Sequence, residues 1–497
     1  MSAQERALAP DLARGFMLLL IAIANTPWYL WGQGGERTSA HPGGGSTLDQ
    51  ITQGLIVTTV DLRVYPMFAF LFGYGVVMLY QRQVASGTSE KAAFRLLQRR
   101  NLWLVVFGFV HALLLWFGDI LGAYGLVGLI LVWLFLRRKN GTLLVWSGIG
   151  VVLLLLLTAL TLLSAVALSP EEGTVDTFDL YFIIDAANGE PNYFASALAR
   201  IPFWLMLIAI QGFIGLAVPI AILLGMWAAR HRILEQPADH LTLLRIAAIV
   251  GIAIGWSGGA VRASAKLGMW EPSELMDGAL EMVQLSTGLA GGIGYVALFG
   301  LMGHWLRNRT TLGVGGTAVV AVGKRSLSCY LAQSILCAPV LAAWGFGLGE
   351  HMHSFTMALY AVAVWVVIGV WAFYLEKKSQ RGPSRSCCDD SPTANRGREL
   401  DAAELLLPTQ LPQPIPLTPP SNVPLRHQEV PAEPHPFLQQ QFPHATLRKQ
   451  VPAVAVRVVP LHLIVGILGV HFATEDRLEL IRTIGVQIRC LQARPER

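Results

Sequence analysis

The sequence predicts an all-α fold: a polytopic membrane helix bundle with about ten transmembrane helices, followed by a disordered C-terminal tail. Two observations support this prediction. Of the 497 residues, 53% are hydrophobic and 14% are charged, whereas soluble proteins average about 25% charged residues. The apolar residues also form blocks of about the 20 residues that cross a bilayer core. We therefore expect the protein to contact membrane lipid, and we do not interpret its net charge of +5 as a sign of nucleic-acid binding.

The apolar blocks place the predicted helices in chain order. The first block is interpreted as an uncleaved helix, because its apolar run continues past Ala22-Ile23-Ala24, a stretch typical of a signal-peptide cleavage site. The predicted helices span residues 14–32, 62–80, 102–118, 120–136, 143–168, 201–228, 243–261, 282–306, 325–346 and 355–375.

The charges of the connecting loops predict an orientation. Every second loop is basic, whereas the loop 169–198 is acidic. Basic residues collect on the cytoplasmic side of a membrane, so both ends of the bundle are predicted to be cytoplasmic. The loops 33–60, 169–198 and 262–281 are then expected at the outer face. The basic positions are Arg82, Lys91, Arg95, Arg99 and Arg100, then Arg137, Arg138 and Lys139, then Arg230, Arg232 and Arg245, then Arg307 and Arg309, and finally Lys377 and Lys378.

A change in composition near residue 381 divides the chain into a transmembrane domain, 1–380, and a tail, 381–497. Residues 383–460 hold more than half of the 27 prolines and show no helical period, so the tail is predicted to be disordered. A second interpretation is out-of-frame translation. The segment Gly382–Asn395 can be back-translated so that a neighbouring frame reads Pro-Val-Glu-Val-Leu-Leu-Arg-Arg-Leu-Thr-Tyr-Gly-Lys, a typical amphipathic end of a membrane protein. The sequence of the gene tests this interpretation.

Two ionisable residues mark the third predicted helix and the hairpin that follows it. His111 lies inside the apolar run, and its neighbours at helical spacing are apolar. An ionisable residue at membrane depth is costly and needs a partner, so its default interpretation is functional. Asp119 follows eight residues later, about 12 Å along a helix axis, so the two are not expected to form a pair. His111 is interpreted as a general base, a proton relay or a structural histidine bonded to a backbone carbonyl.

The first helix carries three polar residues. Asp11, Arg14 and Asn25 fall within about 60° on one helix face. Asp11 and Arg14 have the spacing of an ion pair at a helix start, and Asn25 is expected to hydrogen-bond to another helix. Asp61 begins the second helix, beside the outer loop 33–60.

The ninth helix also carries polar residues. Tyr330 and Gln333 lie on one stripe with Ser326; they are interpreted as contacts between helices or as the lining of a cavity. Lys324 and Arg325 come at its cytoplasmic mouth, where they are interpreted as contacts for phosphate or lipid headgroups or as orientation signals. The five cysteines have no metal-ligand spacing, so no metal site is predicted.

These segments together resemble the YeiB family of bacterial membrane proteins over about residues 5–383. The most specific piece runs from His111 to Tyr124. The other matching pieces are Asp11–Phe16 with Asn25, Tyr65–Gly75, Arg99–Arg100, and Gly323 through Tyr330 to Gln333. The C-terminal half of this family is catalogued as a domain of unknown function, and the family has no settled activity. The resemblance implies a bacterial plasma membrane protein.

The opening Asp-x-x-Arg-Gly is also similar to transmembrane acyltransferases, including the heparan glucosaminide acetyltransferase group. In that group a histidine of the first outer loop carries the acyl group, and an Asp-Leu…Pro stretch follows it. His41 and Asp61-Leu62…Pro66 lie in the corresponding order. The resemblance therefore implies His41 as a second candidate for the acyl-carrying residue.

The leading hypothesis is a membrane acyltransferase that takes an acyl group from a cytoplasmic carrier such as acyl-CoA and passes it to a small-molecule acceptor at the outer face. His111 or His41 would act as base or acyl carrier, oriented by Asp119 or Asp61. The substrate-binding residues would be Asp11, Arg14, Asn25, Lys324, Arg325, Tyr330 and Gln333. The alternative is a proton-coupled transporter or efflux protein with His111 and Asp119 in a proton relay. The oligomeric state is left open.

Overall fold

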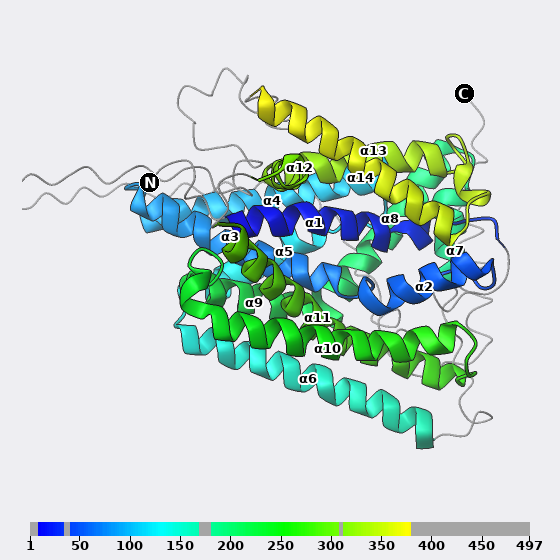
Figure 1. Ribbon diagram of the computed structural model, residues 1–497, viewed down its shortest axis with the longest axis horizontal. Helices are drawn as coiled ribbons and strands as arrows, with labels where there is room; N and C mark the ends of the chain where they lie inside the picture. Colours follow the sequence, from blue (N-terminus) through cyan, green and yellow to red (C-terminus); the bar gives the residue numbers. More distant parts are fainter. Residues whose placement is uncertain (1–7, 34–39, 168–179, 308–311, 379–497) are drawn as a thin grey trace, which may run out of the picture. The chain divides into compact units, whose positions relative to one another are not determined.

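The apolar blocks of the sequence fold into helices. The computed structural model describes residues 8–33, 40–167, 180–307 and 312–378, and every regular element within these ranges is a helix (Figure 1). The predicted all-α class is confirmed for this part of the chain. The predicted tail, 381–497, lies outside the described residues, so its disorder and its out-of-frame origin stay predictions.

The helices follow one another with short connections. They are α1 (Leu8–Ala24), α2 (Thr47–Thr59), α3 (Val64–Ala85), α4 (Glu90–Leu114), α5 (Leu121–Phe135), α6 (Asn140–Ala167), α7 (Leu180–Ile184), α8 (Tyr193–Ala209), α9 (Ala217–Arg230), α10 (Leu241–Lys266), α11 (Glu274–Arg307), α12 (Val314–Lys324), α13 (Ser326–Leu341) and α14 (Ser354–Lys377). Short 3-10 helices lie at Thr26–Tyr29, Pro237–His240 and Leu348–Glu350, and π-helical segments lie at Asp185–Gly189 and Ile210–Ile214.

Among the described residues, 6 helical segments are long and apolar enough to cross a membrane. They are Thr47–Ala85, Asn140–Ala167, Tyr193–Ile214, Pro237–Lys266, Glu274–Leu306 and Ser354–Lys377. The shorter helices α5, α9, α12 and α13 are also apolar. A chain with several such helices is a multi-pass membrane protein, because helices satisfy every backbone hydrogen bond within the bilayer.

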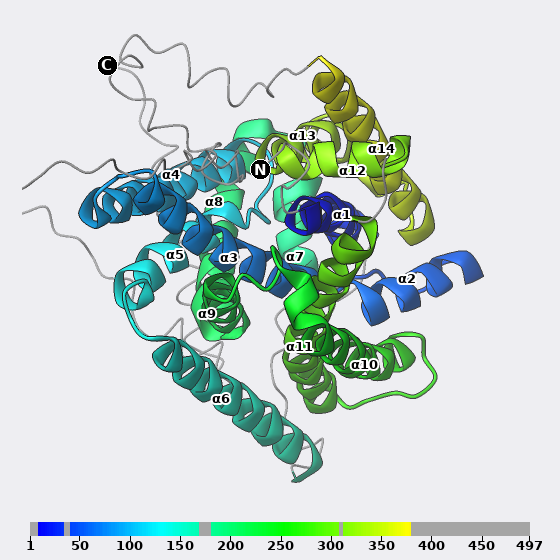
Figure 2. The same cartoon turned by 60° about the vertical axis from the view of Figure 1, so that its left-hand side comes forward.

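The helix α6 shows the consequence of a lipid environment most clearly. It lies at the edge of the helices in both views (Figures 1 and 2). Its sequence is apolar on all sides, yet Leu143, Ser147, Leu154 and Thr158 are its buried residues. Most of its leucines and valines are exposed, as expected where one helix face packs on protein and the rest contacts lipid.

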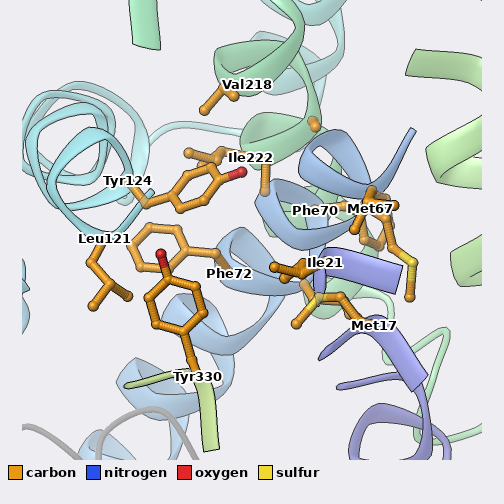
Figure 3. Packing of buried hydrophobic residues seen from close by; sticks show 14 of the residues in the cluster. Met17, Ile21, Met67, Phe70, Phe72, Leu121, Tyr124, Val218, Ile222 and Tyr330 are labelled. Carbon is orange, nitrogen blue, oxygen red and sulfur yellow. The ribbon is translucent and has the colours of Figure 1, made fainter. Parts of the chain in front are cut away.

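The core lies among α1, α3, α5, α9 and α13. Met17 of α1 faces Met67 of α3, and Phe72 of α3 lies against Tyr124 of α5 (Figure 3). The helices α3 and α9 approach closely at Gly73 and Gly225, where a Cβ atom would collide with a backbone carbonyl of the other helix. Small residues at such crossings permit close packing in membranes.

The predicted helix 201–228 is interrupted, which corrects the prediction. The helix α8 ends at Ala209, a π-helical segment follows, and Leu216 has a left-handed backbone with φ 56° before α9 begins. Gly215 and Pro219 flank this break. Proline in the first turn of α9 lacks the N–H that would continue the preceding helix. The apolar residues on both sides hid the break from the hydropathy pattern.

Two of the loops that the charge pattern assigns to the outer face are shorter than predicted. The helix α2 occupies most of the second half of the loop 33–60, and Ser46 and Asp49 form a capping box at its start. This Ser-x-x-Asp pattern is a sequence signal for a helix start. The loop 262–281 narrows to residues 267–273, because α10 continues to Lys266 and α11 begins at Glu274. The helix α12 is a further addition, directly before α13.

Candidate functional site

His111 and Asp119 are in direct contact, which overturns the expectation that they would not pair. The Nδ1 atom of His111 lies 2.9 Å from Oδ1 of Asp119. The expectation assumed helical rise between them, but α4 ends at Leu114 and the chain reverses over residues 115–120. Both side chains are buried, with exposed fractions of 4% for His111 and 0% for Asp119.

The Asp119 carboxylate is held by several further donors. Its Oδ2 accepts the Gly122 backbone N–H at 2.8 Å and lies 3.4 Å from the indole nitrogen of Trp204. Its Oδ1 lies 3.5 Å from the hydroxyl of Tyr330. Gly108 on α4 leaves room for this carboxylate, because a Cβ atom there would collide with Oδ2. The carboxylate is therefore fixed by both α5 and more distant helices.

The second ring nitrogen of His111 has a different environment. Among the described residues, Nε2 has no hydrogen-bond partner, while the ring lies against the Tyr330 ring at a centroid distance of 5.3 Å. A carboxylate on Nδ1 favours the tautomer in which Nε2 is free to accept a proton. This is the arrangement of a histidine general base with its orienting carboxylate.

A cavity of about 30 Å³ lies beside this pair, between α1, α3, α4, α5 and α13. This volume corresponds to about two or three water molecules, at about 10–15 Å³ each. Tyr330 lines the cavity and also contacts Asp119, so the cavity reaches the histidine pair through one side chain. Its residues are Arg14, Met17, Leu18, Phe68, Leu71, Phe72, Gly75, Arg100, Leu121, Ser326, Leu327 and Tyr330; Tyr330, Phe72 and Leu121 are seen together in Figure 3.

Two arginines give the cavity a positive charge. Arg14 forms an ion pair with Asp11, at 3.7 Å between Nη1 and Oδ1. Arg100 is 1% exposed, and its Nε and Nη1 atoms have no hydrogen-bond partner among the described residues. Its guanidinium carbon lies 5.2 Å from the centre of the Phe72 ring. The sequence had marked Arg100 as a loop charge and as part of the YeiB resemblance, but not as a site residue; its position on the buried face of α4 was the signal.

Arg100 and His111 lie on the same face of α4. They are eleven residues apart, which at 100° per residue brings their directions within about 20° and separates them by about 16 Å along the axis. Leu104 and Gly108, between them on that face, are buried. The cavity residue Arg100 and the histidine of the pair are therefore aligned along one buried face of α4.

A second histidine–aspartate pair joins His41 and Asp61, the two residues that the acyltransferase resemblance singled out. Nε2 of His41 is 2.7 Å from Oδ2 of Asp61. The pair stands at the turn between α2 and α3, where Leu62 has φ 59°. Arg63 fixes this turn by donating to the carbonyl oxygens of Val57, Asp61 and Gly255. The two predicted histidines and the two predicted carboxylates thus form two separate pairs.

Residues 228–384 match a family described as "Protein of unknown function (DUF418)". This part of the chain is therefore similar to the DUF418 family. The chain is 26% identical over 399 residues to the uncharacterized protein YeiB of Escherichia coli (strain K12), with 76% of this chain and 94% of YeiB covered. It is 28% identical over 341 residues to the uncharacterized protein YxaH of Bacillus subtilis (strain 168), with 65% and 77% covered. The predicted YeiB resemblance is confirmed.

The part of the chain that matches the DUF418 description contains Tyr330 and the rest of α13 but begins after both histidine pairs. The predicted cytoplasmic charges Lys324 and Arg325 are both bound in ion pairs. Each lies 2.6 Å from an oxygen of Glu376 on α14. Sequence analysis had not singled out Glu376. Both cations are thus paired with Glu376, and neither lines the cavity at Arg14 and Arg100.

Of the two remaining predicted residues, Gln333 and Asn25, Gln333 has a structural contact. Gln333 donates from Nε2 to the carbonyl oxygen of Leu18 at 2.8 Å, which joins α13 to α1. Asn25 lies just after α1 ends, and its side chain makes no cap hydrogen bond to the following turn. Neither residue lines the cavity. In the described ranges, no cluster of three or more histidine, cysteine, aspartate or glutamate side chains suits a metal ion.

Proposed function

We propose that this protein is a membrane acyltransferase. It takes an acyl group from a cytoplasmic carrier such as acyl-CoA and passes it to a small-molecule acceptor at the outer face. The observation that carries the proposal is the environment of His111: Asp119 binds Nδ1 at 2.9 Å, while Nε2 is buried and has no partner among the described residues.

The geometry supports a general-base role for His111. Nε2 accepts the proton of the acceptor's hydroxyl or amine as that group attacks the thioester carbonyl. The carbon–sulfur bond then breaks, and the thiol of the carrier leaves with the proton that the histidine held. Asp119 positions the ring and stabilises the imidazolium. Tyr330, with its hydroxyl 3.5 Å from Asp119, links this chemistry to the cavity.

His41 is the second candidate for the acyl carrier. Its Nε2 is bound to Asp61 at 2.7 Å, so the ring is oriented by a carboxylate in the same way. His41 is 9% exposed, and it lies in the predicted outer loop. In this version of the proposal, His41 receives the acyl group before the acceptor does.

Contacts between distant loops support the proposed orientation, with about ten crossings and both ends of the bundle cytoplasmic. Lys324 binds Glu376, and Arg230 donates to the carbonyl oxygens of Leu136 and Arg138. These contacts join loops that the charge pattern assigns to the cytoplasm. On the other side, Trp31 donates to the carbonyl of Leu341, which joins two predicted outer segments.

The test uses the full chain, purified in a neutral detergent, with acetyl-CoA labelled in the acetyl group. Protein-bound label and free coenzyme A thiol are measured together. We expect thiol release in the wild type and its loss in His111→Ala, whereas protein-bound label is expected only in the version in which His41 carries the acyl group. His41→Ala separates the two versions, because this substitution abolishes the protein-bound label only if His41 is the acyl carrier. His351→Ala, an exposed outer histidine, is the matched control. Unchanged label and thiol release in both histidine variants would refute the proposal.

The alternative, a proton-coupled transporter or efflux protein, is favoured by the break between α8 and α9. Transporters place substrate sites at discontinuous helices, usually in pairs, and Leu216 with its left-handed backbone marks one such break. Proton flux into vesicles, driven by a substrate and absent in His111→Ala, would support transport. An acetyl-CoA-dependent label without proton flux would support the acyltransferase.

A further inference from the structure

The charge of Arg100 is not compensated by a carboxylate. Its side chain is 1% exposed, and it forms no ion pair with a described residue, since Arg14 is the charged group that acts on it, with like sign. Arg14, in contrast, has Asp11 at 3.7 Å and Glu235 within Coulomb reach. A buried charge without a partner is strongly unfavourable. Such a group persists where a ligand supplies the opposite charge.

The cavity next to Arg100 gives that ligand a place. It has about 30 Å³ and is lined by both arginines and by Ser326, and its other walls are largely apolar. The buried Nε atom of Arg100 is a donor without a partner among the described residues, as is its Nη1. Guanidinium groups bind phosphate oxygens through paired hydrogen bonds.

We infer that the cavity at Arg14 and Arg100 binds a phosphate group of an amphipathic ligand. One negative charge neutralises the uncompensated guanidinium of Arg100, and a phosphodiester or a diphosphate oxygen supplies such a charge. The apolar walls formed by Phe72, Leu71 and Leu327 suit a chain attached to that phosphate. Two sources have this chemistry: the phosphate of the acyl carrier and the headgroup of an anionic phospholipid.

The dimensions of the site favour the acyl carrier. Arg100 and His111 are separated by about 16 Å along α4. An extended chain of about five peptide units spans this distance, and the phosphopantetheine arm of coenzyme A, with its two amides, is of similar length. The length of this arm therefore matches the separation of Arg100 and His111 along α4. This step deepens the proposed function and rests on it, whereas phosphate binding itself does not.

The test measures thermal stability of the full chain in neutral detergent with four separate probes. They are coenzyme A, pantetheine (the same arm without phosphate), short-chain phosphatidylglycerol and inorganic phosphate. We expect coenzyme A to raise the melting temperature by several degrees at a large excess over its Kd, and pantetheine to have no such effect. A shift with phosphatidylglycerol alone assigns the site to a lipid headgroup.

Three variants identify the residue. In Arg100→Gln the shift with the phosphate ligand disappears, and in Arg100→Lys it becomes smaller because the planar fork is lost. Arg138→Gln, an exposed arginine of the loop between α5 and α6, is the matched control and keeps the full shift. Without ligand, Arg100→Gln melts at the wild-type temperature or higher, because a buried unpaired charge has been removed. A purely structural Arg100 predicts the opposite.

The outcomes separate the inference from the proposed function. If phosphate ligands shift the wild type but not Arg100→Gln, and no acetyl label is transferred, the site stands and the acyltransferase fails. If label is transferred while Arg100→Gln keeps the full shift, the acyltransferase stands and this site is refuted. The absence of a shift with every phosphate probe also overturns the site.

Discussion

The hydroxyl of Tyr330 lies 3.5 Å from Oδ1 of Asp119, although the two residues are 211 positions apart. The contact joins α13, within the residues that match the DUF418 family, to the hairpin between α4 and α5. Tyr330 also lines the cavity that holds Arg14 and Arg100. One side chain thus connects the carboxylate, the histidine and the arginines.

Tyr330→Phe tests this connection. The variant removes one hydroxyl and keeps the ring that packs on His111. A hydrogen bond to a charged group contributes about 1.5–3 kcal/mol, but this one is long, at 3.5 Å, so we expect only a roughly fivefold to tenfold fall in thiol release from acetyl-CoA. The melting temperature should change little. A variant with full activity would show that the hydroxyl takes no part in the reaction.

Asp119→Asn tests the role of the carboxylate. The amide keeps the size of the side chain but favours the wrong tautomer of His111, so we expect acyl transfer to fall by about 10³–10⁴-fold. Thiol release is the measurement. Asp119→Ala serves for comparison: it leaves the Gly122 N–H and the Trp204 indole without their acceptor, so it should also be less stable by about 1–3 kcal/mol. Equal thiol release by Asp119→Asn and the wild type would contradict the base mechanism.

Glu376→Gln tests whether Lys324 and Arg325 are structural. Glu376 accepts from both cations at 2.6 Å, and its side chain is 28% exposed. Partly exposed ion pairs contribute about 0–1 kcal/mol each, so we expect a melting temperature lower by a few degrees and unchanged thiol release. The fall in melting temperature is expected to be larger at low salt, because weaker screening makes these ion pairs stronger in the wild type. If a stable Glu376→Gln variant lost acyl transfer, Lys324 and Arg325 would have a functional role and not only a structural one.

Gly73→Ala tests the crossing of α3 and α9. A Cβ atom at this position would collide with the carbonyl of Ile222, so we expect a loss of about 1–3 kcal/mol of stability from overpacking. Gly148→Ala on α6 is the control, because a Cβ atom there meets no neighbour within 4 Å. Thermal melting of both variants is the measurement. Equal melting temperatures would mean that the two helices separate without cost.

The ends of some helices could not be predicted from the sequence. The apolar run around His111 continues through Phe117, so hydropathy contains no signal that α4 stops at Leu114. The stop comes with tertiary packing: the Trp116 ring stacks on Tyr29 with centroids 4.0 Å apart. The break at Leu216 was hidden in the same way. The start of α2, in contrast, carries a capping box that the sequence displays openly.

The sequence by itself determined that this protein is helical and crosses a membrane, because apolar side chains in a bilayer leave the backbone no solvent and helices satisfy it locally. It also carried the resemblance to YeiB and singled out the candidate residues His41, Asp61, His111 and Asp119. Only the tertiary structure decided which of them touch. Contacts such as His111–Asp119, Lys324–Glu376 and the placement of Arg100 beside an acid-free cavity depend on where chains turn and how helices cross. Those turns are set by packing between distant residues, which no local pattern contains.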